Sequence, residues 1–98
     1  MAKYAVIDLQ PALQIKYELQ QFDAHLSQLT REVVSAKVAT NTIEQLAMCL
    51  ESAIQNGLDP IQTQSRTHVL TLLAFEYGYS QEEVEGLLTA YIQPNGSY

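Results

Sequence analysis

Two histidines and one cysteine are the side chains of this sequence best suited to catalysis or metal binding. His25 and His68 have no His, Cys or acid three or four residues downstream, where one helix face would supply further metal ligands. Cys49 could act as a nucleophile with either histidine as base. It stands, however, between Met48 and Leu50 beside an apolar helix face, a setting typical of a core cysteine. The four glycines are too scattered for a phosphate loop. We therefore expect no catalytic site, no metal, no cofactor and no enzymatic activity.

The balance of charge narrows the classes of partner. The chain has 98 residues and a net charge of −6, enough length for one domain with a modest core. From Glu76 to the C-terminus there are four acids and no Lys or Arg. Nucleic acids and anionic membranes attract basic surfaces, so neither is an expected partner. A lone cysteine, no signal-peptide pattern and no apolar run of ~18–20 residues predict a cytoplasmic, soluble protein.

Apolar periodicity predicts an all-α fold, a small four-helix bundle-like domain over residues 1–98. The expected helices span residues 11–37, 41–56, 60–77 and 81–93, and a loose tail covers 94–98. Residues 4–9 are apolar but have no partner strand, and they suit an extended arm or a frayed first turn. Helix starts and stops are indicated by Pro11, by the cap candidates Thr40, Asn41 and Thr42, by Gly57, by Asp59 with Pro60, and by Gly78 and Ser80.

The strongest periodic signal is a seam of apolar residues in the long first helix, spaced alternately three and four apart. Its members are Ala12, Ile15, Leu19, Phe22, Leu26, Leu29, Val33 and Ala36. The seam either packs against later helices or forms a homodimer, with Ile15, Leu19, Phe22, Leu26 and Leu29 as the oligomer seam. In a parallel dimer Glu18 would oppose Asp23 and Glu32 would oppose Lys37, so charge does not select that dimer. Val33 and Val34 are poorer helix formers, which allows a break near Thr30 or Ser35.

The third predicted helix has two unlike halves. Its first half, 62–68, is polar and expected to be solvated, and Arg66 with His68 is the one place suited to anion contacts. Its second half carries Val69, Leu70, Leu72, Leu73 and Phe75 over a wide arc. That half is therefore predicted to be the most buried part of the chain.

The third and fourth predicted helices meet at a sharp corner. Gly78 ends one helix, and Ser80 with Glu83 forms a capping box for the next. With Ala74 four residues before the glycine, and Val84 and Leu87 after it, residues 70–87 resemble the helix-turn-helix of phage-repressor-type DNA-binding proteins. The resemblance implies a major-groove reading helix that begins near Ser80.

The residues at the start of that helix depart from the family. Glu82, Glu83 and Glu85 would face phosphates, which repel carboxylates. Tyr79 beside the cap is a candidate for an exposed contact, since tyrosine is common at interfaces.

The favoured hypothesis is a small acidic protein-interaction module, such as an adaptor, inhibitor or accessory subunit, in which Glu82, Glu83, Glu85 and Tyr79 bind a basic or apolar protein surface. A homodimer is one option. The alternatives are a helix-turn-helix regulator and a small-ligand-binding helical protein.

Overall fold

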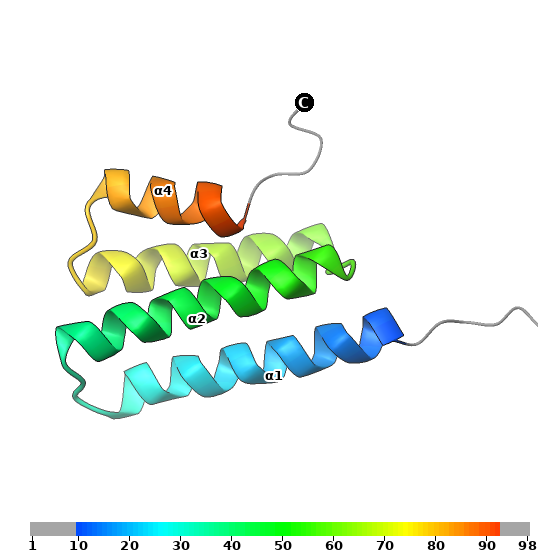
Figure 1. Cartoon of the computed structure of the whole chain (residues 1–98), viewed down its shortest axis with the longest axis horizontal. Helices are drawn as coiled ribbons and strands as arrows, with labels where there is room; N and C mark the ends of the chain where they lie inside the picture. The colour runs from blue at the N-terminus through cyan, green and yellow to red at the C-terminus, as the bar shows by residue number, and fades with distance from the viewer. Residues whose placement is uncertain (1–9, 93–98) are drawn as a thin grey trace, which may run out of the picture.

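A computed structural model of the chain describes residues 10–92, so the segment 4–9 and the tail 94–98 lie outside the described residues. The helices are α1 (Gln10–Arg31), α2 (Ala36–Gln55), α3 (Pro60–Glu76) and α4 (Gln81–Tyr91). No strand occurs within 10–92, which confirms the all-α prediction. Successive helices run back and forth (Figure 1). Of the four described helices, α1 packs against α2 alone, whereas α3 and α4 pack against α2 and against each other.

The predicted first helix of 11–37 is wrong at its C-terminal end, because α1 stops at Arg31 and a short linker precedes α2. The alternative of a break near Thr30 or Ser35 is confirmed. Ser35 caps α2, and its side chain accepts a hydrogen bond from the Val38 backbone N–H at 3.3 Å. The first backbone N–H groups of a new helix have no carbonyl partner within it, and the serine side chain satisfies one of them. The expected cap candidates 40–42 instead lie inside α2, where Thr40 donates its hydroxyl hydrogen to the Ala36 carbonyl at 2.9 Å.

The remaining predicted ends are confirmed to within one or two residues, because each depends on chemistry within a single turn. Asp59 caps α3 by accepting a hydrogen bond from the Gln62 backbone N–H at 2.8 Å, and Pro60 follows as the first helical residue. Gly57 and Gly78 take positive φ angles of 104° and 91° after α2 and α3. A β-carbon disfavours this backbone region, which explains glycine at both positions.

The apolar seam of α1 is used inside the chain. Phe22 and Leu29 are buried, and Ile15, Leu19 and Leu26 are half-buried against the core. The predicted outer members of the seam, Ala12, Val33 and Ala36, are exposed. The five central residues therefore hold α1 on α2 as a helical hairpin. The C-terminal end of α1 is also held by the Tyr77 hydroxyl, which donates to the Leu29 carbonyl at 3.1 Å and satisfies one of the carbonyls left over at a helix end.

The core is centred on α2, not on the second half of α3 as the sequence predicted. Among the described residues, α2 contributes seven of the fifteen buried apolar side chains, more than any other helix: Ala39, Ile43, Leu46, Ala47, Cys49, Leu50 and Ala53. The other eight are Phe22, Leu29, Leu58, Leu70, Leu73, Ala74, Val84 and Leu87. In α3, Leu72 and Phe75 are exposed. The apolar arc of α3 is wider than the strip that α2 and α4 cover, so part of it faces outward.

Candidate interaction surface

The corner between α3 and α4 is built as its residue types predict. Ala74 is fully buried, and Val84 and Leu87 on α4 are buried opposite it. Both halves of the capping box are present: Ser80 Oγ accepts from the Glu83 backbone N–H at 3.1 Å, and Glu83 Oε1 accepts from the Ser80 backbone N–H at 2.9 Å. These local bonds fix where α4 begins and how its first turn is oriented.

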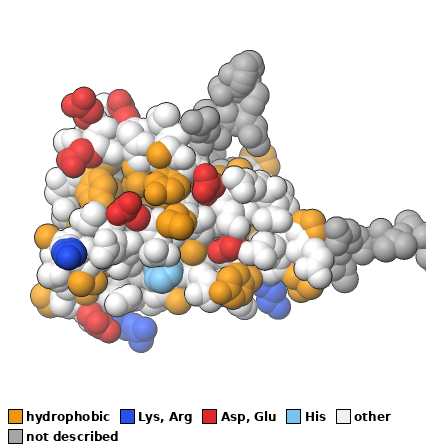
Figure 2. All heavy atoms as spheres, in the orientation of Figure 1, with side chains coloured by type: hydrophobic (Ala, Val, Ile, Leu, Met, Phe, Trp, Pro, Cys, Tyr) orange, Lys and Arg blue, Asp and Glu red, His pale blue; other side chains and the backbone are white. Residues whose placement is uncertain are grey.

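The three predicted carboxylates of α4 are all exposed, but they do not have the same role. Glu83 turns back to the cap, and these hydrogen bonds from Ser80 lower the pKa of its carboxyl. Glu82 and Glu85 are three residues apart and so share a face of the helix. Figure 2 shows acidic side chains gathered over the start of α4, whereas the basic side chains on this side lie over α1 and the start of α2. Glu82 and Glu85 are therefore the carboxylates most available to a partner.

Tyr79 lies half-buried against the core, less exposed than expected, at the junction of α2 and α4. Burial raises the pKa of its phenol, a hydrogen bond with the Thr40 side chain opposes this effect, and the charges of Glu44 and Glu83 raise the pKa further. The phenol therefore lies close enough to carboxylates of two helices, Glu44 on α2 and Glu83 on α4, for their charges to act on it. Glu44 was missed in the sequence because it lies far from α4 along the chain. We call Glu44, Tyr79, Glu82, Glu83 and Glu85 the acidic edge.

The capping role of Glu83 predicts a loss of stability in acid. Its pKa is lowered from 4.5 in the folded state, so its contribution to stability is present above about pH 4.5 and disappears as the pH falls through the lower folded value. In Glu83→Gln the free energy of unfolding should decrease less between pH 6 and pH 3, measured by urea unfolding. Glu32→Gln, which removes an exposed carboxylate outside the cap, should keep the full decrease, and equal curves for the two variants would contradict this role.

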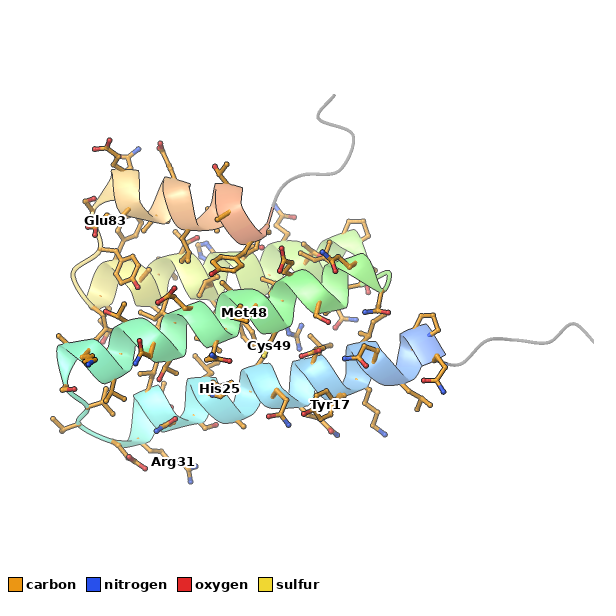
Figure 3. The ribbon with its side chains drawn as sticks, in the orientation of Figure 1. Tyr17, His25, Arg31, Met48, Cys49 and Glu83 are labelled. Carbon is orange, nitrogen blue, oxygen red and sulfur yellow. The ribbon has the colours of Figure 1, made fainter. Side chains whose placement is uncertain are left out.

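The side chains that could have carried catalysis lie apart from the acidic edge. Cys49 is buried on the side of α2 that faces α1 (Figure 3). Burial, and then the charge and hydrogen bonding of Glu18, raise the pKa of its thiol to about 11. A thiol with this pKa stays protonated at neutral pH and is a poor nucleophile. Within residues 10–92 no group of three His, Cys, Asp or Glu side chains is arranged to hold a metal ion.

The predicted anion site at the start of α3 is not assembled. Arg66 is half-buried, and its guanidinium donates from one terminal nitrogen to Gln62 Oε1 at 3.3 Å. Its Nε is buried without a hydrogen-bond partner. His68 is exposed two residues further on, and side chains two apart on a helix point to different faces. The two basic groups therefore do not converge on one ligand.

The feature that the sequence did not reveal is a set of large apolar side chains left outside the core. Ile61, Leu72 and Phe75 are exposed on α3, and Leu13 and Tyr17 are exposed on α1. The seven-residue spacing from Ile61 to His68 to Phe75 was a usable signal for a second face, because such residues fall on one side of a helix.

No protein-family model matches this chain, and no curated protein or solved structure matches it significantly. Within the described residues, no helix has both the length and the apolar character needed to cross a membrane.

Proposed function

We propose that this protein is a small acidic interaction module whose acidic edge binds a basic protein surface. The observation that carries the proposal is the setting of Tyr79, whose phenol lies near carboxylates of both α2 and α4. An aromatic ring beside several carboxylates suits a Lys or Arg side chain, which gains a charge contact and a cation–π contact together. Tyrosine and exposed charges are also typical of interface rims.

Charge along the rest of the corner supports this choice of partner. No Lys or Arg follows Arg66 in the sequence, so the acids of α4 have no basic neighbour on their own helix. The first turn of α4 is the part that a helix-turn-helix protein would place in the DNA groove. Its exposed carboxylates would meet phosphates there and be repelled. A basic protein fits the same surface without this cost.

The test uses the full chain and defined probes. Fluorescently labelled Arg-rich and Lys-rich peptides, an acidic peptide of equal length and a DNA duplex would be titrated with the protein, and binding followed by anisotropy at about 50 and 200 mM salt. We expect the basic peptides to bind, and to bind more weakly at the higher salt. The double variant Glu82→Gln/Glu85→Gln should weaken this binding about fivefold or more, equivalent to about 1 kcal/mol.

The matched control is Asp23→Asn/Glu32→Gln, which removes two exposed charges from α1 and the linker after it. It should change binding less than about twofold, because exposed charges beyond ~10 Å are largely screened. Equal effects of the two double variants would show that net charge, not the acidic edge, attracts the peptides. Binding of the duplex in place of the peptides would favour the helix-turn-helix alternative.

A further inference from the structure

The outward side of α3 forms a second surface, distinct from the acidic edge. Ile61, Leu72 and Phe75 are 80%, 55% and 45% exposed. Ser65 and His68 are also exposed. In chain order these five residues are spaced four, three, four and three apart, and they therefore form one stripe along the helix. Single exposed apolar residues are ordinary on protein surfaces, whereas a shared stripe marks a contact site. We call these five residues the α3 stripe.

The α3 stripe is free of carboxylates, although the chain as a whole carries a net charge of −6. Residues 60–75 contain no Asp or Glu. Their one Arg, Arg66, is half-buried, and Asp59 and Glu76 stand only at the two ends. The start of α4, by contrast, presents three carboxylates. A second negatively charged copy of the chain would therefore meet little like-charge repulsion over the length of this stripe, and it would be repelled at the acidic edge.

The two end residues of the stripe also lie symmetrically about His68. Ile61 lies seven residues before it and Phe75 lies seven residues after it. We propose that a second copy of this chain docks here, with the two α3 helices antiparallel about a two-fold axis at His68. Each Ile61 then packs against the partner's Phe75, which gives the self-complementary contact that a two-fold dimer requires.

The remaining contacts of this arrangement follow from the same two-fold axis. Leu72, four residues after His68, lies beside the partner's Gln64, so each leucine is covered by the stem of an uncharged side chain. Glu76 reaches the partner's Pro60 at the start of the partner helix, where the helix dipole favours an acid. Asp59 at that same end opposes this attraction, so the ends contribute little and the apolar pairs supply the affinity.

The size of the stripe sets the expected strength of the dimer. Fifteen helical residues extend about 21 Å, and packed helices lie ~8–10 Å apart. One helix pair of this length is smaller than the ~800 Å² per partner of a standard stable interface. The dimer is therefore weak, with a dissociation constant of about 10–100 μM or above.

Analytical ultracentrifugation of the full chain from about 10 μM to 1 mM tests the proposal, since this range spans the expected dissociation constant. The wild type should shift from monomer to dimer. Leu72→Glu/Phe75→Glu should weaken the dimer about tenfold or more, because each copy gains two charges at the contact. Ile61→Glu should weaken the dimer at least about threefold. This variant places an acid in the first turn of α3, where helices tolerate a negative charge. Circular dichroism verifies that each variant remains folded.

The matched control is Leu13→Glu/Tyr17→Glu on α1, where the two side chains are 55% and 54% exposed. This control adds the same charge to a similarly exposed apolar pair. It should change the dissociation constant of the dimer less than about threefold, which is the effect of net charge alone.

The position of the two-fold axis is tested by His68→Cys, which should form a covalent dimer on oxidation, whereas Gln20→Cys on α1 should not. A wild type that stays monomeric throughout, or a control that weakens the dimer as much as the α3 variant, would overturn the proposal.

Discussion

Phe22→Ala should lower the free energy of unfolding by about 3–5 kcal/mol, the usual cost of deleting a buried aromatic ring. Phe22 is 1% exposed and is one of the largest fully buried side chains. It lies in the middle of α1 and belongs to the buried core, where the surrounding structure closes such a cavity only in part. Since a small domain is stable by only about 5–15 kcal/mol, the loss should leave a much less stable protein.

The matched control is Tyr17→Ala in the same helix. Tyr17 is also aromatic but is 54% exposed, and substitutions at such sites change stability by about 0.5 kcal/mol. Urea unfolding followed by circular dichroism would measure both variants. Similar losses for the two would mean that α1 is not held by its apolar seam.

Gly78→Ala and Gly86→Ala should change stability in opposite directions, although both add one methyl group to an exposed glycine. Gly78 has a φ of 91°, where an alanine is strained by about 1–2 kcal/mol. Gly86 lies inside α4, and an added β-carbon would meet nothing within 4 Å. There alanine should stabilise the protein by up to about 1 kcal/mol, since glycine is the poorer helix former.

Neither glycine has an atom within 4 Å of the added carbon, so the contrast isolates backbone conformation from packing. Thermal and urea unfolding of the two variants under the same conditions measure the difference, which should be about 1–3 kcal/mol. A stabilised Gly78→Ala would show that the chain leaves α3 by a different turn.

Interactions between residues that are close together in the chain could be predicted from the sequence. Ser80 and Glu83 predicted a capping box, Asp59 and Pro60 predicted a helix start, and Gly78 predicted a helix end. Each forms its bonds within one turn, so no distant residue is needed to decide it. The end of α1 has the same cause, because Ser35 offers a local cap at one of the two positions where the sequence allowed a break in the long apolar pattern.

The exposed surface around the corner was only partly predictable from the sequence. Glu82 and Glu85 were expected to be exposed and they are, because the corner has no Lys or Arg that could pair with them. Glu44 beside Tyr79 was not foreseen, because the proximity of α2 to the start of α4 exists only in the folded chain.

Four helices, most of their ends and the acidic character of α4 could be predicted from the amino-acid sequence, because these follow from interactions over a few residues. Which apolar residues are covered depends on how the helices pack together. Phe22 is buried and Phe75 is exposed, although both belong to apolar helical patterns. The reason is geometric: α2 lies between its neighbours and is covered on several sides, whereas α1 is covered by α2 alone and α3 by α2 and α4, so both keep an outward face.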